Sequence, residues 1–451
     1  MRIKQISVSG LFGIFDHVIP LNIDERITII HSPNGFGKTA ILRILNSFFN
    51  SRYTDLRAIP FRNFRVEFDD STSVEIIKNT ENVENSEVNI VINFYKHDLK
   101  PVSFALRRVN SHDDKEILIS FSSDDLIPAK EQLYSTGLMN LSIEKIRYLE
   151  DYLQGFYSLS SSNFKLQQEP DWLEKLKSNI HIHLIESQRL LNFVPKRSSK
   201  RSAETPSMLS TVSAYSDELA KLMQDKFKEY GTTSQSLDRT FPIRVVKQQP
   251  STDLTDEQLR HQLNELEATR SRLIEVGLLD KDEDAEFQIQ PQDIDESTKN
   301  ALSVYVQDVE KKLSVFADIA SKIDLLRKII NNKFAYSYKE INFSKEKGFV
   351  ITTSYNSPLS NSKTLLPTDL SSGEQHELVL LYELLFKVQP NSLVSIDEPE
   401  LSLHVGWQVQ FLKDLQDITQ LTDLNILMAT HSPDIIQDRW DLTVELKGPH
   451  K

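Results

Sequence analysis

The amino-acid sequence predicts an α/β fold with a long helical stretch between its strand-rich ends. Residues 27–30 and 393–396 are short, mostly apolar runs typical of buried strands. The middle of the chain instead carries apolar residues at helical spacing, including Leu259, Leu263 and Leu266. Strands at both ends with helices between them indicate a mixed α/β fold.

The composition narrows the possible partners and compartments. At 451 residues and 39% hydrophobic content, the chain is long enough for two or three domains. The net charge of −13 provides no bulk positive field for DNA or for an anionic membrane, so a DNA surface must be local or come from a partner. The absence of cysteine excludes disulfides, cysteine-ligated zinc and thiol nucleophiles. We find no signal peptide and no apolar stretch of about 20 residues, and we therefore expect a cytoplasmic protein without a membrane segment.

The N-terminal hundred residues are predicted to be mostly strands. Ile6 and Val8 alternate with polar neighbours, and Ile3 extends the same apolar set. Residues 69–71 can turn the chain between two strands, which predicts a hairpin. From about residue 141 the spacing becomes helical. The expected strands are residues 3–8, 27–30, 64–68, 74–76 and 88–94, and the expected helix contains Ile146, Leu149 and Leu153 before Gly155.

The middle of the chain is predicted to form a short antiparallel coiled coil. Residues 195–206 are a polar loop, and an extended piece surrounds Phe241 and Pro242. A first helix then opens with the capping pair Thr255 and Gln258. A second carries an apolar seam over residues 302–323, and the acidic residues 280–291 separate the two. Two core helices of a globular subdomain are the alternative interpretation.

A phosphate-binding loop follows the first buried strand. Residues 32–39 read Ser-Pro-Asn-Gly-Phe-Gly-Lys-Thr and lead into an amphipathic helix, the context that such a loop requires. Glycines let backbone N–H groups converge on phosphate oxygens, and the helix N-terminus favours an anion. Lys38 would reach the β- and γ-phosphates and Thr39 would hold Mg²⁺. Ser32 replaces the first glycine of the usual pattern. The expected nucleotide contacts are Asn34, Gly35, Phe36, Gly37, Lys38, Thr39 and Ala40.

Two carboxylates end the second buried strand. Asp397 suits a role in Mg²⁺ binding, and Glu398 suits a general base that polarises the attacking water. Strand ends often carry acidic residues for other reasons, so this pattern gains its meaning from the phosphate-binding loop upstream. Both residues are predicted members of an ATP site.

Two further segments carry residues that could face a nucleotide. Residues 370–375 form a Ser-Ser-Gly turn that opens a helix, which is either an anion site or ordinary N-capping by Ser371 or Ser372. His431 follows the predicted strand 426–430, where α/β sheets place their ligands. A structural histidine is the alternative there.

Together these motifs resemble the ATP-sandwich (ABC/SMC-type) ATPases, in the branch that includes SMC-like, RecF-like and OLD-type proteins. The resemblance implies a P-loop ATPase head with lobes at 1–190 and 341–451 and a coiled-coil insertion at 191–340. It implies that residues 370–375 are a signature loop acting on the opposite protomer, so a homodimer or higher oligomer is expected. It also implies Walker B and D-loop roles for residues 397–404. The site residues that it adds are Ser371, Gly373 and Glu374 for nucleotide binding, His431 as a catalytic switch, and Gln188 as a nucleotide and metal contact.

The resemblance extends to a biological role. The chain looks similar to the ATPase subunit of Septu-type antiphage systems, which implies an HNH-type nuclease partner, DNA contact through the complex, and turnover of ATP that is slow or regulatory. A DNA-repair SMC-like ATPase is an alternative. A transporter subunit is disfavoured because Thr39 and Ser371 lie far apart in the chain. An OLD-type nuclease is disfavoured because the sequence leaves no room for a Toprim domain after His431.

Overall fold

The computed structural model contains two compact units. One consists of Met1–Val18 and Arg57–Asn179, and the other of Ile19–Leu56 and Ile180–Lys451. The structure describes residues 1–79, 89–96, 99–106, 169–187, 191–192, 209–247, 255–281, 296–354 and 363–448.

The first unit is built on a six-stranded sheet of order β2-β1-β4-β5-β6-β7. Neighbouring strands from β1 to β7 pair antiparallel, and the predicted hairpin is confirmed as β4 and β5. A register shift between Ile3 and Gln5 explains why Ile3 and Ile6 are both buried despite their odd spacing. The elements are β1 (Ile3–Leu11), β2 (Phe15–Pro20), β4 (Asn63–Phe68), β5 (Ser73–Asn79), β6 (Asn89–Tyr95), β7 (Val102–Leu106) and α6 (Asp171–Ser178). The short helix α2 (Tyr53–Ala58) contains the unit boundary between Leu56 and Arg57.

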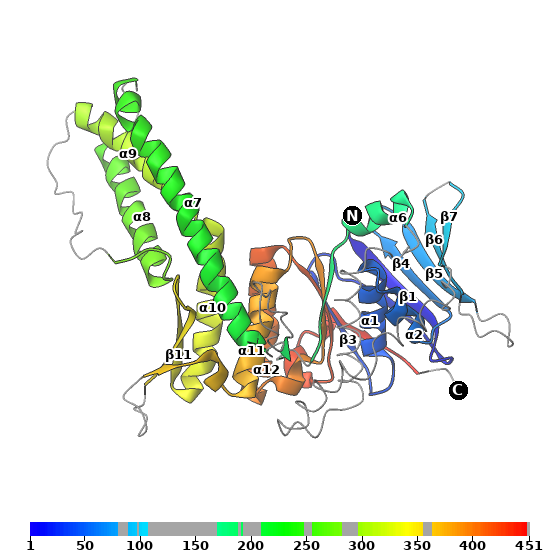
Figure 1. Cartoon of the computed structure of the whole chain (residues 1–451). Coiled ribbons are helices and arrows are strands. Elements are labelled where there is room, and N and C mark those ends of the chain that lie inside the picture. The colour runs from blue at the N-terminus through cyan, green and yellow to red at the C-terminus, as the bar shows by residue number, and fades with distance from the viewer. Residues whose placement is uncertain are drawn as a thin grey trace, which may run out of the picture. The chain divides into compact units, whose positions relative to one another are not determined.

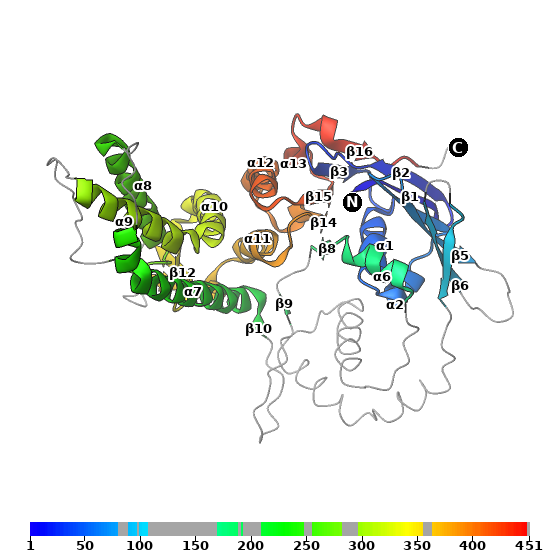
Figure 2. The same ribbon diagram turned by 90° about the horizontal axis from the view of Figure 1, so that it is seen from above.

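The second unit contains a parallel sheet of order β16-β3-β15-β14-β8. Figure 2 shows α1 on one face of this sheet and α11 and α12 on the other. Both predicted buried strands are confirmed as β3 and β14, and every residue of β14 is buried. Parallel strands bring their carboxyl ends to one edge, which is where the predicted site residues follow. The elements are β3 (Ile27–His31), α1 (Lys38–Phe49), β8 (Ile182–Ile185), α11 (Ser372–Tyr382), β14 (Leu393–Asp397), α12 (Val405–Thr422), β15 (Asn425–Ala429) and β16 (Thr443–Glu445).

A helical insertion extends from this unit (Figure 1). We call α7 (Thr211–Lys247), α8 (Asp256–Glu275) and α9 (Glu296–Ser314) the arm, and α10 (Ala317–Phe334) follows it. The helix α9 packs against both α7 and α8. The buried leucines of α8 and the seam residues of α9 and α10 belong to the same apolar core as β14. The predicted apolar stripes are therefore confirmed, and the insertion shares its core with the sheet.

The pairing of the arm helices differs from the expectation. The start of α8 pairs with the start of α9 through Asp256 and Lys299 at 2.7 Å, and Glu275 near its end pairs with Arg327 of α10 at 3.6 Å. The helix α8 therefore runs in the same direction as α9 and α10. The antiparallel partner of α9 is α7, since Asp238 bonds Lys312 at 2.7 Å and Arg244, later in α7, pairs with Asp308, earlier in α9.

Two sequence predictions in this region differ from the structure, one at Pro242 and one at residue 315. The expected extended piece around Phe241 and Pro242 is wrong, because the long helix α7 continues through this proline. The Arg244 guanidinium pairs with Asp308 of α9 and donates to the Leu237 carbonyl at 2.7 Å, which fastens the turn that contains the proline. The continuous seam over 302–323 is interrupted between α9 and α10, so it spans two helices.

Shorter elements complete the described part of the second unit. The hairpin β11–β12 and strand β13 form a three-stranded sheet beside α7 and α10. No helix of the described residues is long and apolar enough to cross a membrane. The expected helix over residues 146–153, the loop 195–206 and most of the acidic stretch 280–291 lie outside the described residues. The remaining elements are β9 (Leu191–Asn192), β10 (Leu209–Ser210), η1 (Ala335–Ser337), β11 (Lys339–Ser344), β12 (Gly348–Thr353), β13 (Thr364–Leu365), η2 (Pro367–Asp369), η3 (Glu383–Lys387), η4 (Pro399–Ser402), α13 (Pro433–Ile436) and η5 (Trp440–Leu442).

Candidate functional site

The loop between β3 and α1 has the backbone that a phosphate cradle needs. Gly35 and Gly37 adopt left-handed conformations with φ of 86° and 90°, which a side chain would strain. Gly37 occupies the N-cap position, so the chain turns there directly into α1. Buried apolar residues of α1, among them Ile41 and Leu45, fix the direction of the helix. The free N–H groups of the first turn therefore point toward the loop.

Lys38 lies at the start of α1 with its side chain folded back over the loop. Its Nζ donates to the carbonyl oxygens of Ser32 at 3.1 Å and Pro33 at 3.5 Å, and it contacts Nε2 of His431. Burial lowers the pKa of Lys38, while the nearby carboxylates of Glu398 and Asp397 oppose this effect. The ammonium is therefore a buried cation that a phosphate would stabilise.

Thr39 and Asp397 meet beside Lys38. The Thr39 hydroxyl lies 2.9 and 3.0 Å from the two carboxylate oxygens of Asp397, the last residue of β14. Burial raises the pKa of Asp397 to about 6, against the stabilising hydrogen bond from Thr39. A buried carboxylate of raised pKa is a group that a bound cation would stabilise in its charged form.

These two residues fit Mg²⁺. A hydroxyl and a carboxylate are oxygen ligands of the kind that Mg²⁺ uses together with phosphate oxygens and water. Within the described part of the chain, no group of three or more His, Asp or Glu side chains could hold a metal by itself. Thr39 and Asp397 would accordingly hold Mg²⁺ together with a phosphate ligand, as the sequence predicts.

Glu398 comes next in the chain and has an unusual backbone. Its φ is 44°, the left-handed region, and Pro399 follows it. A non-glycine residue rarely adopts the left-handed conformation, and a following proline restricts the backbone further. The surrounding fold must therefore stabilise the backbone of Glu398 in this conformation. Its N–H donates to the carbonyl of Ala429, the last residue of β15, at 2.9 Å. This bond holds Glu398 at the carboxyl edge of the parallel sheet.

His431 follows β15 and joins this cluster. Its Nε2 lies 3.4 Å from a Glu398 carboxylate oxygen and also contacts Lys38. Its backbone N–H donates to the Glu400 carboxylate at 2.6 Å, which fixes the position of the His431 backbone. The ring therefore lies between the cation and the carboxylate.

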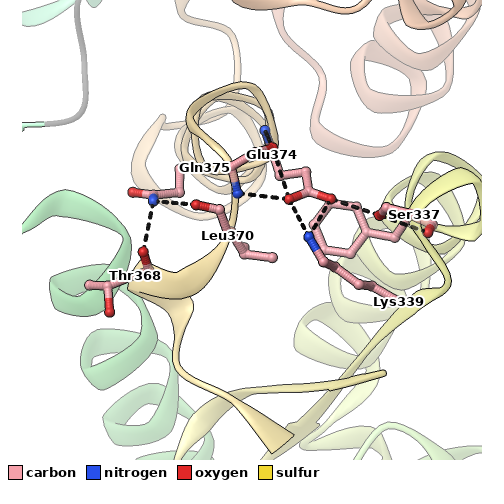
Figure 3. Close-up of polar contacts among 8 residues, drawn as sticks. Ser337, Lys339, Thr368, Leu370, Glu374 and Gln375 are labelled. Atoms are coloured by element: carbon pink, nitrogen blue, oxygen red, sulfur yellow. Dashed lines mark hydrogen bonds and ion pairs between the residues drawn. The ribbon is translucent and has the colours of Figure 1, made fainter. Parts of the chain in front are cut away.

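Ser371 occupies a different setting. It is exposed and caps α11, accepting from the Glu374 N–H at 3.4 Å, while its own N–H and hydroxyl donate to the Glu374 carboxylate at 2.8 and 2.9 Å. Gln375 donates to the carbonyls of Thr368 at 3.2 Å and Leu370 at 2.8 Å, which holds the preceding turn (Figure 3). Gly373 lies in the first turn of α11. The N-capping expected as the alternative interpretation is therefore present.

Glu374 is buried rather than open to a ligand of its own protomer. Its carboxylate accepts from Lys339 Nζ at 2.8 and 3.0 Å and from the Ser337 hydroxyl at 2.7 Å (Figure 3). Although burial opposes ionisation, the hydrogen bonds from Lys339, Ser337 and Ser371 hold the pKa of Glu374 below its usual value. Glu374 thus remains a charged acceptor that supports Ser371.

The sequence-predicted residues fall into two groups. Five of them form the first group, in which Lys38, His431 and Glu398 are in contact, Thr39 bonds Asp397, and the Asp397 carboxylate acts electrostatically on Lys38. Ser371, Gly373 and Glu374 form the second group at the start of α11. In the loop, Asn34 and Gly35 are exposed, and Phe36 and Ala40 are half-buried. Gln188 lies outside the described residues. The members of the first group are Lys38, Thr39, Asp397, Glu398 and His431.

Sequence reasoning missed three supporting residues. Glu400 lies two residues after Glu398, and this nearness was an available signal. Ser337 and Lys339 had no such signal, because their importance comes only from contact with Glu374 across the fold.

A comparison with protein-family models identifies an ATPase family. The model of the AAA ATPase domain family matches residues 1–436. No curated protein matches the chain. Among solved structures, the Smc head domain of Pyrococcus furiosus, with an extended coiled coil and bound to the C-terminal domain of ScpA, is 13% identical. The superposition covers 96% of the present chain and 91% of the Pyrococcus furiosus chain, with a TM-score of 0.32. The SMC head domain from Thermotoga maritima is 10% identical, with coverage of 97% and 92% and a TM-score of 0.33.

Proposed function

Because the chain belongs to the AAA ATPase domain family, we propose that it binds and hydrolyses ATP at the cluster of Lys38, Thr39, Asp397, Glu398 and His431. The observation that carries the proposal is the 2.9 Å hydrogen bond between Thr39 and Asp397, together with the buried ammonium of Lys38, on which the Asp397 carboxylate acts electrostatically. These groups provide a cation for phosphate and oxygen ligands for a metal at the edge of one sheet.

The residues suggest a division of labour during hydrolysis. The N–H groups of the glycine loop and Lys38 bind the phosphates and orient the γ-phosphate. Mg²⁺, held by Thr39 and Asp397, would neutralise phosphate charge when bound. Glu398 accepts the proton of a water whose oxygen attacks the γ-phosphorus, while the bond to the β-phosphate oxygen breaks. His431, between Lys38 and Glu398, keeps both side chains oriented.

A second protomer would complete the site. Ser371 is exposed at the N-terminus of α11, and its described polar contacts are with Glu374 rather than with the cluster at Lys38. An exposed helix N-terminus can bind a phosphate presented by another chain. We therefore propose an ABC-type arrangement in which ATP lies between the Lys38 cluster of one protomer and Ser371 of the other, so that turnover requires a dimer.

The wider role is proposed from the resemblance given above. It is that of an ATPase subunit in a DNA-directed antiphage complex, acting with a separate HNH-type nuclease in the cytoplasm. The net charge of −13 favours DNA contact through a partner over a broad surface of this chain. A DNA-repair SMC-like ATPase is compatible with the same site. Cleavage of DNA by the purified chain alone would contradict the need for a nuclease partner.

The two-protomer site is tested by trapping it. Glu398→Gln removes the base but keeps the shape of the side chain, so the variant should bind ATP without hydrolysing it. We therefore expect an ATP-bound dimer to accumulate, which light scattering during gel filtration measures. Adding Ser371→Arg should prevent this dimer, because the long side chain would sterically block the exposed N-terminus of α11 that is proposed to meet the phosphate. Ser314→Arg, at an exposed position in the arm, is the matched control and should leave the dimer intact.

Two results would contradict the proposal. Normal ATP turnover by the Glu398→Gln protein would remove Glu398 from the role of base. A Glu398→Gln protein that binds ATP yet stays monomeric at every concentration tested would remove the two-protomer site.

A further inference from the structure

A small polar cluster beside Ser371 is larger than helix capping requires. We call Ser337, Lys339, Ser371 and Glu374 the serine clamp. Capping needs only the reciprocal bonds between Ser371 and Glu374. Here the Glu374 carboxylate accepts from three residues, two of which belong to η1 and β11, outside the capped helix.

The geometry of the serine clamp makes Lys339 its cation. Lys339 Nζ reaches both carboxylate oxygens, at 2.8 and 3.0 Å, and the side chains of Lys339 and Glu374 are 12% and 4% exposed. A carboxylate this deeply buried is costly to keep charged without a paired cation. The same oxygen that Lys339 approaches most closely also receives the N–H and the hydroxyl of Ser371. Lys339 therefore fixes the acceptor that orients the Ser371 hydroxyl.

A second lysine binds α11 one turn further along. Lys333 of α10 pairs with Glu377 and with Asp414 of α12, at 2.7 Å to the latter, and these side chains are almost completely buried. Glu374 and Glu377 lie three residues apart, so they project from the same side of α11. The segment that leaves the arm, α10 to β11, is thus joined to α11 at two successive turns. Movement of this segment would carry the N-terminus of α11 with it.

We propose that Lys339 is a positioning residue for Ser371, and that through it the position of the α10–β11 segment sets how Ser371 meets ATP on another protomer. This inference rests on the proposed two-protomer site. It adds a way for the arm to influence hydrolysis without contacting the nucleotide, because the arm continues directly into α10.

Lys339→Met in the Glu398→Gln protein is the direct test. Methionine retains the apolar stem but loses the charge, so the Glu374 carboxylate that accepts from Ser371 loses the cation that holds it in place. We expect the ATP-dependent dimer to dissociate about tenfold more readily, the factor that follows from losing one charge-assisted hydrogen bond. ATP binding to the single protomer, measured by fluorescence of a labelled ATP, should change less than about twofold. In the protein with Glu398 intact, kcat should fall while KM stays nearly constant.

Three variants separate positioning from loss of structure. Lys339→Arg keeps a cation and should restore most of the dimer. Ser337→Ala removes one donor from the same carboxylate and should weaken the dimer in the same direction, by a smaller factor. Lys347→Met, at an exposed position in the β11–β12 turn, is the matched control and should behave as the parent protein.

A double-mutant cycle tests the route through Glu374. If Lys339 acts on Ser371 through this carboxylate, the double variant Lys339→Met with Glu374→Gln should weaken the ATP-dependent dimer no more than the more damaging of the two single substitutions. Fully additive losses would overturn the inference. So would a Lys339→Met protein whose dimer and kcat equal those of the parent, or a Lys339→Arg protein as defective as Lys339→Met.

The test also distinguishes this inference from the proposed function. If the parent Glu398→Gln protein forms no ATP-dependent dimer, the two-protomer site itself is wrong. If the parent forms the dimer and Lys339→Met forms it equally well, only the role of Lys339 is wrong.

Discussion

The Lys38 cluster and the serine clamp are built in opposite ways. In the Lys38 cluster, each side chain lies at the carboxyl end of a strand of one parallel sheet or on the loop or helix that follows it, so the sheet itself brings them together. In the serine clamp, Ser371 depends on Glu374, and Glu374 depends on Ser337 and Lys339 from another part of the chain. The first site is fixed by its own scaffold, whereas the second is fixed through the segment that leaves the arm.

This difference suggests which site can be regulated. The ends of buried parallel strands cannot shift without disturbing the core. A helix N-terminus held by ion pairs to a neighbouring segment can shift as that segment shifts, because its contacts lie outside its own scaffold. Variants in the two regions should therefore separate ATP binding from the completion of the site by a second protomer.

The largest expected effect comes from Lys38→Ala. It removes a buried ammonium that would contact two phosphates, so we expect ATP binding to weaken by a factor on the order of 100 or more. Isothermal titration calorimetry with a non-hydrolysable ATP analogue measures this change. Lys413→Ala, at an exposed position in α12, is the control and should bind normally. Equal losses of binding in Lys38→Ala and Ser371→Arg would break the comparison between the two regions.

The next effect concerns pH and Asp397. Its pKa rises from 3.8 to about 6 on folding, so the folded chain holds this proton more tightly than the unfolded chain does. Stability therefore falls as pH rises from about 4 to 6, by roughly 3 kcal/mol if the whole shift is expressed. Asp397→Asn cannot ionise, and without Mg²⁺ it should be more stable than the parent at pH 7.5, with a smaller difference at pH 4.5.

Urea unfolding at both pH values measures the Asp397→Asn effect. Asp24→Asn, an exposed aspartate, serves as the control and should show little difference from the parent at either pH. An Asp397→Asn protein less stable than the parent at pH 7.5 would mean that contacts of the carboxylate outweigh the cost of its burial.

The smallest effect is expected from His431→Gln. Glutamine can keep one hydrogen bond to Lys38 or Glu398 but not the position between both, so kcat should fall about tenfold while ATP binding changes little. Steady-state hydrolysis measures the first quantity, and titration measures the second. His261→Gln in the arm is exposed and should have no effect on either. A loss of binding as large as that of Lys38→Ala would instead make His431 part of the phosphate cradle.

The Lys38 cluster could be predicted because its signals are local. Glycines before Lys38, an apolar strand before Asp397 and another before His431 are each visible within ten residues of sequence. The parallel sheet then places their ends together as a consequence of its topology. Roles for individual residues in binding and catalysis remain predictions, as do the lobe boundaries at 190 and 340.

The arm and the serine clamp could not be predicted in detail because their signals are not local. Pro242 argues for a break, yet packing of α7 against α9 and the bonds of Arg244 outweigh the lost hydrogen bond. The directions of α8 and α9 follow from pairs such as Asp256 with Lys299, which no periodicity reveals. Nothing in the local sequence distinguishes Lys339 from an ordinary surface lysine, because its contact with Glu374 arises only in the folded chain.

The backbone of Glu398 has a consequence for protein engineering. A left-handed residue before proline is a position where glycine or asparagine would suit the chain better. Selection for thermal stability alone would therefore tend to replace the residue proposed to activate water. A library screened only for heat resistance is expected to enrich inactive proteins at this codon, and screening must retain ATP turnover to keep the glutamate.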